Sequence, residues 1–179
     1  FTNKYFDDTV DYFGEIEAFY QLKLKYNKNG LNVRCMFDRV IVNHITKAIQ
    51  PIDLKTTGKD EEEFENSFLA WSYWIQSNMY SEILKLIIEE DDYFKDFTIL
   101  PFLFVVVNKN NKTPLVWCDI NNLEKGDRID KYNNIHKYWI TLYKDLKWHI
   151  DNEEYKYSIE SIQNNGVRIL NNIKIKKDE

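Results

Sequence analysis

The pattern of hydrophobic and polar residues in the first part of the chain is typical of paired β-strands. Over residues 15–26 apolar side chains occupy every second position, with Phe19 as the one exception, which predicts a half-buried strand. Residues 27–30 read Asn-Lys-Asn-Gly, a composition typical of a hairpin turn. We therefore expect residues 31–43, rich in Val, Ile and Phe, to form the antiparallel partner, followed by a third short strand over 49–56.

Apolar residues in the second half of the chain recur at two different spacings. A helical spacing over 60–90 predicts one long amphipathic helix, opened by acidic residues in the arrangement of a capping box. Its apolar stripe, expected in the core, comprises Phe64, Phe68, Trp71, Ile75, Met79, Ile83 and Leu86. Strands are predicted over 97–107 and 115–120. A second helix over 129–149 is indicated by Tyr132, Ile135, Trp139, Leu142 and Leu146.

The resulting order, β-β-β-α-β-β-α, predicts an α/β protein in which a mixed β-sheet is flanked by α-helices. With 179 residues the chain suits a single domain, for which we expect a lead-in over 1–14, a core over 15–120 and a C-terminal helix and tail over 121–179. Because the first residue is Phe1 rather than Met, we expect the chain to be a fragment that lacks N-terminal residues.

Composition and charge exclude several classes of protein. The net charge of −5 excludes binding of nucleic acid through overall positive charge, although it is compatible with a local basic groove. No apolar run approaches the ~20 residues that a membrane-spanning helix needs. Two cysteines cannot form a disulfide scaffold or a four-cysteine metal site, so we expect an intracellular protein in which Cys35 and Cys118 are small buried residues. The three scattered histidines, His44, His136 and His149, argue against a histidine-based metal site.

Three charged residues of the second and third strands are candidates for chemistry. Asp53 and Lys55 are two residues apart on a predicted strand, so their side chains project from the same face. Asp38 lies within an apolar strand, on the same face as Met36 and Val40, where a charge is costly unless it is paired or bound to a metal. If the two strands are neighbours, Asp38 approaches Asp53, and a divalent metal would relieve the repulsion between their carboxylates. Oxygen ligands alone favour Mg²⁺ or Mn²⁺.

These residues also match a known sequence pattern. Asp38 is followed, after fourteen intervening residues, by Asp53-Leu54-Lys55, and the downstream helix carries Gln76-Ser77-Asn78-Met79-Tyr80. The first two elements resemble the core of the PD-(D/E)XK nuclease superfamily, and the third resembles the Q-x-x-x-Y motif of its RecB-like branch. The closest similarity is to phage and bacterial recombination exonucleases of the RecE and lambda-exonuclease type, over residues 15–120.

The resemblance implies a restriction-endonuclease-like core and hydrolysis of DNA phosphodiester bonds with Mg²⁺ or Mn²⁺. In this role Asp38 and Asp53 would ligate the metal together with the carbonyl of Leu54, and Lys55 would orient the attacking water. Gln76 and Tyr80, at positions i and i+4 of one helix, would brace the site or contact the DNA backbone. The resemblance further implies DNA as the partner, a cytoplasmic location in a bacterial or phage-infected cell, no membrane, and either a homo-oligomer or a recombination protein as an additional partner.

Two other interpretations stay open. The family usually carries a further Glu or His on a helix before the hairpin, and Glu17, the best acid on the first strand, lies opposite that strand's apolar face. The residue would otherwise lie upstream of Phe1, or the chain would be a catalytically inactive DNA-binding or assembly module of the same fold. The third interpretation is an unrelated β-rich interaction domain in which the Asp-x-Lys spacing is a coincidence, and a structure with Asp38 and Asp53 far apart would decide for it.

Overall fold

A computed structural model describes residues 10–13, 15–110 and 113–163 of the chain. The chain divides into two compact units, residues 1–139 and 140–179. The first unit carries every element that bears on the candidate site, and the expectation of a single domain stays a prediction. The parts of the predicted lead-in and tail that fall on 1–9 and 164–179 lie outside the described residues.

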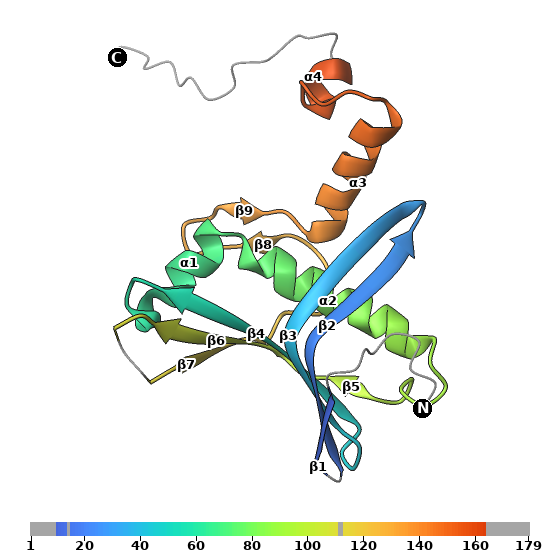
Figure 1. Cartoon of the computed structure of the whole chain (residues 1–179). Coiled ribbons are helices and arrows are strands. Elements are labelled where there is room, and N and C mark those ends of the chain that lie inside the picture. Colours follow the sequence, from blue (N-terminus) through green and yellow to red (C-terminus); the bar gives the residue numbers. More distant parts are fainter. Residues whose placement is uncertain (1–9, 14, 111–112, 164–179) are drawn as a thin grey trace. The chain divides into compact units, whose positions relative to one another are not determined.

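The first unit is built on a mixed β-sheet, which Figure 1 shows. Its strands are β1 (Val10–Phe13), β2 (Ile16–Lys28), β3 (Leu31–Asn43), β4 (Ala48–Thr57), β5 (Thr98–Ile99), β6 (Phe102–Asn108) and β7 (Leu115–Asp119). They follow the order β1-β2-β3-β4-β6-β7, with β5 also paired to β4. Only the pairings of β4 with β5 and β6 are parallel. The predicted α/β class and its mixed sheet flanked by helices are therefore confirmed.

The prediction of one continuous helix over 60–90 is wrong. The segment is divided into η1 (Glu61–Glu63), α1 (Phe64–Ala70) and α2 (Tyr73–Glu89). The break lies at Trp71 and Ser72, because Ser72 adopts a left-handed backbone with φ 58°, which ends the ladder of helical hydrogen bonds. Trp71, expected in the core, is 71% exposed at this corner.

The helix predicted over 129–149 is correct only in its second half, where α3 (Trp139–Asp151) forms. Its first half lies in a hairpin of β8 (Arg128–Ile129) and β9 (Ile135–His136). The Asp130 carboxylate accepts hydrogen bonds from the backbone N–H groups of Tyr132 and Asn134, so a local turn replaces the helix there. As a result Tyr132 and Ile135 are exposed rather than buried. A short helix, α4 (Ile159–Gln163), follows in the second unit.

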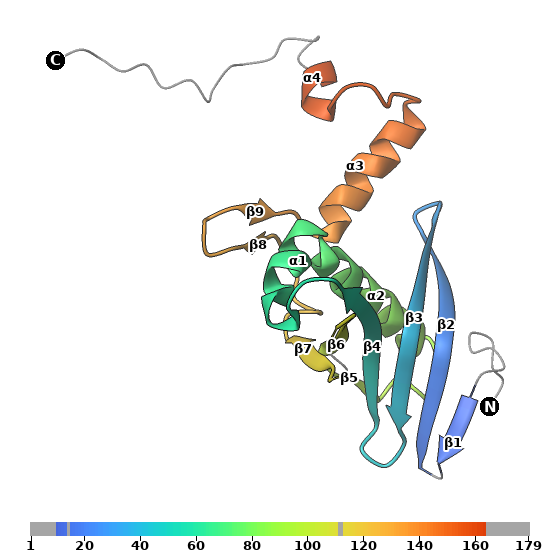
Figure 2. The ribbon, with the colours of Figure 1, turned by 60° about the vertical axis from the view of Figure 1, so that its left-hand side comes forward.

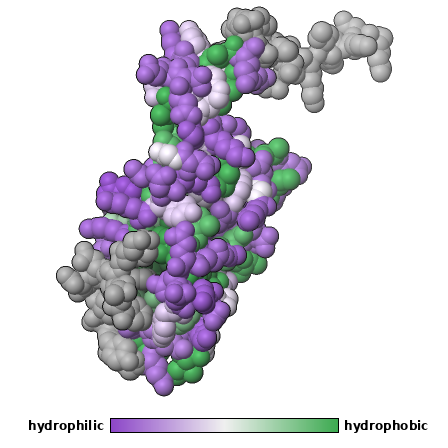
Figure 3. Space-filling model, turned by 90° about the vertical axis from the view of Figure 1, so that its right-hand side faces the viewer, coloured by the Kyte–Doolittle hydropathy of each residue, from purple (hydrophilic) through white to green (hydrophobic). Residues whose placement is uncertain are grey.

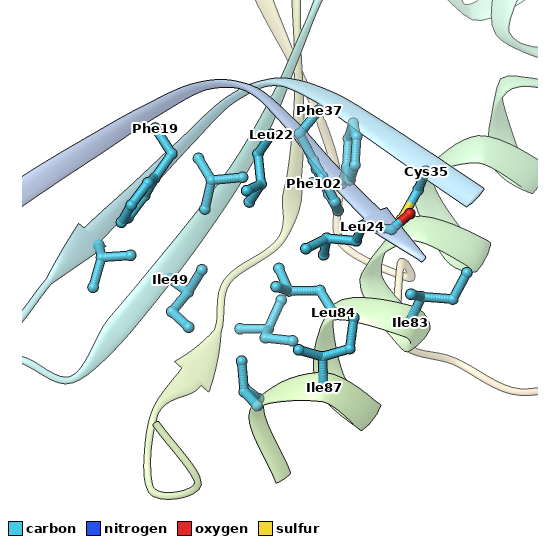
Figure 4. Packing of buried hydrophobic residues seen from close by; sticks show 14 of the residues in the cluster. Phe19, Leu22, Leu24, Cys35, Phe37, Ile49, Ile83, Leu84, Ile87 and Phe102 are labelled. Atoms are coloured by element: carbon cyan, nitrogen blue, oxygen red, sulfur yellow. The ribbon is translucent and has the colours of Figure 1, made fainter. Parts of the chain in front are cut away.

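The hydrophobic core lies between one face of the sheet and α2, as Figures 2 and 4 show. Leu22 and Phe37 of the hairpin point into the same cluster as Leu84 and Ile87 of α2 (Figure 4). Each of these side chains is at most 3% exposed. Because complete burial of such a side chain contributes roughly 1.5–3 kcal/mol, this contact fixes α2 against the sheet.

The two cysteines lie in different environments. Cys35 is buried, as predicted, and burial raises the pKa of its thiol to about 12. Cys118 is exposed, so the expectation that it is buried is wrong. Its neighbour Trp117 packs against the core instead, because adjacent residues of β7 face opposite sides of the sheet.

Strands β2 and β3 change the face that they turn to the core halfway along their length. Tyr20 pairs with Arg39 and Leu22 pairs with Phe37, but the residues between them, Gln21 and Asp38, are not paired. Gln21 has a left-handed backbone with φ 51°, which is unusual within a strand. A strand that alternates strictly could not bury the core residues on both sides of Gln21 and Asp38. The alternation of buried and exposed residues therefore restarts at this position.

The change of face explains two features of the sequence. Phe19 broke the predicted alternation of the first strand, and it is buried because it precedes the change at Gln21. The expectation that Asp38 shares a face with both Met36 and Val40 is wrong: Met36 is 43% exposed, whereas Val40 is completely buried. Asp38 thus lies at the position where β3 exchanges its two faces.

One face of the molecule is predominantly polar. Figure 3 shows a face on which hydrophilic side chains prevail and hydrophobic ones are scattered. Among the described residues, no helix has both the length and the apolar character needed to span a membrane.

Candidate active site

The candidate site lies where β3 and β4 separate. The two strands are paired only up to Arg39 and Ile52, while β4 continues alongside β6 as far as Thr57. Figure 1 shows the hairpin of β2 and β3 turning away from β4 beyond this point. The N–H of Leu54 therefore has no backbone partner on β3, and it donates instead to the side chain of that strand's Asp38, to Oδ2 at 2.8 Å. This bond brings the Asp38 carboxylate beside the residue that follows Asp53.

The backbone of Leu54 offers a second group at the same place. In a β-strand the N–H and the C=O of one residue point to the same side of the strand. The Leu54 carbonyl, which the resemblance implies as a metal ligand, is therefore directed to the side of β4 on which Asp38 lies. The separation of β3 and β4 thus places the backbone of Leu54 beside the Asp38 carboxylate.

Asp53, Lys55 and Gln76 form a closed triangle of polar contacts. The ammonium of Lys55 lies 2.7 Å from Asp53 Oδ2 and donates to Gln76 Oε1 at 2.8 Å. The Gln76 amide in turn donates from Nε2 to Asp53 Oδ1 at 2.6 Å. Alternation along β4 turns Asp53 and Lys55 toward α2, and Gln76 lies in the first turns of that helix. The geometry thus places Gln76 as the residue that orients both members of the Asp-x-Lys pair.

The carboxylate of Asp53 is held in a place that favours its neutral form. Asp53 is 5% exposed, and this burial is the main cause that raises the pKa of its carboxyl above the usual value. The negative charge of Asp38 raises it further, whereas Lys55 and the Gln76 amide act in the opposite direction. The two carboxylates therefore lie close enough for their charges to interact.

Aromatic side chains complete the surroundings of the site. The Lys55 ammonium lies 4.2 Å from the centre of the Tyr73 ring, so an aromatic face adds to the negative groups that hold the cation. Tyr80 packs edge-on against Phe37, with 5.1 Å between the ring centres. Burial raises the pKa of the Tyr80 hydroxyl, as do the negative charges of nearby acidic groups, against the effect of a hydrogen bond with the backbone of Met36. Tyr80 therefore contacts β3 beside Asp38 and does not join the triangle.

Glu17, the candidate additional acid, lies elsewhere. It pairs with Val42 in the sheet, four residues from Gln21 along β2, and its Oε2 lies 3.1 Å from Nε2 of His44. The change of face at Gln21 also places Glu17 on the side of Phe19 rather than opposite the apolar residues, contrary to the expectation. The structure does not bring Glu17 to the other candidate residues.

Two residues of the site escaped the sequence analysis, namely Gln21 and Tyr73. Gln21 donates from its amide to Asp38 Oδ1 at 2.9 Å, so both oxygens of that carboxylate are occupied. The signal for Gln21 was present, because Phe19 interrupts the alternation two residues earlier. Tyr73 gave no comparable signal, since its place follows from the break at Ser72, which no residue pattern announces.

The site fits a hard divalent cation with few protein ligands. Within the described residues there is no group of three or more His, Cys, Asp or Glu side chains able to hold a metal ion. The oxygen donors at this place are the carboxylates of Asp38 and Asp53 and the carbonyl of Leu54, and Mg²⁺ is commonly bound by one or two carboxylates plus water and substrate phosphates. In the described part of the chain, Asp53 Oδ2 is buried without a hydrogen bond of good geometry, and its contact is the ion pair with Lys55. The donor set therefore suits Mg²⁺ or Mn²⁺ better than Zn²⁺.

Comparisons of the chain with models of protein families, with curated proteins and with solved structures found no match. The case for a function consequently rests on the geometry of the site and on the sequence pattern.

Proposed function

We propose that the protein is a metal-dependent DNA nuclease with a restriction-endonuclease-like core. The observation that carries this proposal is the convergence of Asp38, Asp53 and Lys55 where two strands separate, with Gln76 joining the last two. A buried Asp-x-Lys pair beside a second carboxylate is the arrangement expected for hydrolysis of a phosphate ester. The match to the PD-(D/E)XK pattern supports the same conclusion.

Each residue then has a distinct task. Asp38, Asp53 and the Leu54 carbonyl would hold Mg²⁺ or Mn²⁺, which supplies Lewis-acid polarisation of a phosphate oxygen when bound. Lys55 would hold the water that attacks phosphorus and offset the charge that develops on the phosphate. Gln76 holds the side chains of Lys55 and Asp53 in place through two hydrogen bonds, and Tyr80 packs against β3 beside Asp38.

The resemblance narrows this proposal further. Recombination exonucleases of phages and bacteria carry the same order of motifs, so we assign an exonuclease that acts in DNA recombination or repair in the cytoplasm of a bacterial or phage-infected cell. DNA is its proposed partner, and a second copy of the chain or a recombination protein is a further one.

A cleavage assay tests the proposal. Linear duplex and single-stranded DNA are incubated with the protein in Mg²⁺, in Mn²⁺ and in EDTA. We expect metal-dependent release of nucleotides that falls on the order of a thousandfold in Asp53→Asn and Lys55→Ala. Asp92→Asn serves as the matched control, since its exposed carboxylate pairs with Lys95 on the surface. Digestion that continues in EDTA, or that survives in Asp53→Asn, would contradict the proposal.

One observation favours a second candidate function, a catalytically inactive module of the same fold. The site holds two carboxylates, and Glu17 is paired with His44 instead of adding a third. An inactive module would bind DNA or a partner protein without a metal requirement and without sensitivity to Asp53→Asn. The same set of variants therefore separates the two functions.

A further inference from the structure

We infer that the outer face of the β2–β3 hairpin is a binding surface for a phosphate backbone, which leads a DNA strand to Asp38. The inference rests on the proposed nuclease function, which it extends by assigning the path of the substrate. It is carried by three cations, Lys23, Lys25 and Arg34, which share one exposed face of the hairpin.

Strand geometry places the three cations on the face of the hairpin opposite the core. This face ends at Asp38, the position where β3 exchanges its two faces, and it runs toward the turn through Met36 to Arg34. On β2 the same face carries Lys23 and Lys25, which follow Gln21, the residue that donates to Asp38. These residues are exposed, apart from half-buried Asp38, whereas Leu22, Leu24, Cys35 and Phe37 between them are buried.

The cations are arranged unfavourably for an isolated protein. Lys25 lies directly opposite Arg34 in the register, and like charges in directly opposed positions destabilise a sheet. Lys23 lies opposite Met36, which places it diagonally beside Arg34. Within the described part of the chain, none of the three takes part in an ion pair. In a chain with net charge −5 such a cluster is a local exception, and a bound polyanion would neutralise it.

The distance between the cluster and the site suits a continuous strand of nucleic acid. Arg34 is four residues from Asp38, which is about 14 Å along a β-strand. This length equals the rise of about four nucleotides along the axis of a B-form helix. Met36 lies between them and is 43% exposed, so an apolar contact surface for a sugar or a base accompanies the cations. A bound phosphate backbone would account both for the positive charge of the three cations and for their distance from Asp38.

The test measures binding of fluorescein-labelled single-stranded and duplex oligonucleotides in EDTA over a range of KCl concentrations. The triple variant Lys23→Gln/Lys25→Gln/Arg34→Gln should bind single-stranded DNA at least about tenfold more weakly, with a salt slope shallower by about 2. The matched control, Lys47→Gln/Lys85→Gln/Lys95→Gln, removes the same charge from surface cations that already have acidic partners, and should bind like the wild type.

Each outcome decides the inference. Equal affinity and salt slope in the triple variant and the wild type would overturn it, as would the absence of measurable DNA binding by the wild type. It would also be overturned if the triple variant lost binding to phosphatidylserine vesicles while keeping its affinity for DNA. Metal-dependent cleavage with unchanged binding in the triple variant would remove this inference alone. Binding that depends on the three cations, without any cleavage by the wild type, would support the surface and remove the nuclease proposal.

Discussion

The carboxylates of Asp53 and Asp119 are both buried and contact adjacent residues of α2, but they differ in the hydrogen bonds and ion pairs that they receive. Asp53 receives one hydrogen bond from Gln76 and an ion pair from Lys55, with the charge of Asp38 nearby. Asp119 is bound by both terminal nitrogens of Arg128, at 3.0 and 2.9 Å, by the Ser77 hydroxyl and by the N–H of Asn121.

The difference separates a structural carboxylate from one suited to a ligand. The bidentate Arg128 pair and two further donors satisfy both oxygens of Asp119, and they tie the segment after β7 to α2. Asp53 is equally buried but lies beside a like charge, an arrangement that a bound cation would stabilise. Burial alone therefore does not distinguish the two acids, whereas the like charge of Asp38 beside Asp53 does.

The largest expected effect is on stability at Asp119. Arg128→Ala leaves the buried carboxylate of Asp119 without its cation and should lower the free energy of unfolding by about 3–5 kcal/mol. Asp53→Asn, in contrast, removes an unfavourable charge and should not destabilise the fold. Urea denaturation measures both. The double variant Asp119→Ala/Arg128→Ala should lose less than the sum of the single variants, and simple additivity would contradict the ion-pair interpretation.

The second prediction concerns the two neighbouring residues of α2. Gln76→Ala removes the bridge between Asp53 and Lys55 and should reduce the cleavage rate about 10–100-fold, as losses of groups that orient metal ligands commonly do. Ser77→Ala affects Asp119 instead and should leave the rate unchanged while lowering stability by about 1 kcal/mol. Equal rates for Gln76→Ala and the wild type would remove Gln76 from the site.

The third prediction follows from the raised pKa of Asp53. A carboxyl whose pKa is raised on folding contributes stability below its unfolded value, 3.8, and that contribution is lost as the pH rises through the folded pKa. Relative to the wild type, Asp53→Asn should therefore gain stability as the pH rises above 3.8 in metal-free buffer. A difference that falls with rising pH would show that the ion pair with Lys55 outweighs burial.

The smallest expected effect tests the change of face in the hairpin. Gln21→Ala and Gln21→Gly both remove the bond to Asp38, but only glycine adopts the left-handed backbone at φ 51° without strain. Gln21→Gly should therefore be more stable than Gln21→Ala by about 1 kcal/mol in urea denaturation. If alanine were the more stable, strain at Gln21 would not explain the exchange of faces.

The sequence predicted strands better than it predicted where helices begin and end. The alternation of the hairpin and the spacing of Asp53 and Lys55 depend on local geometry, so both could be inferred. The breaks at Ser72 and Asp130 could not, because one left-handed residue and one side-chain turn override a helical pattern of apolar residues. Phe19 signalled an irregularity next to Gln21, but the bond from Gln21 to Asp38 could not be inferred, because it depends on how the strands are arranged in space.

The central claim is that the carboxylates of Asp38 and Asp53 form a metal site, and metal binding tests it without any assumption about the substrate. Calorimetric titration of Mn²⁺ into the wild type should give saturable binding that is lost in Asp38→Asn and Asp53→Asn. The control, Asp92→Asn, carries the same change of charge and should bind Mn²⁺ as the wild type does. Binding of Mn²⁺ with equal affinity to the wild type and to Asp53→Asn, or no binding to the wild type with or without DNA present, would contradict the claim.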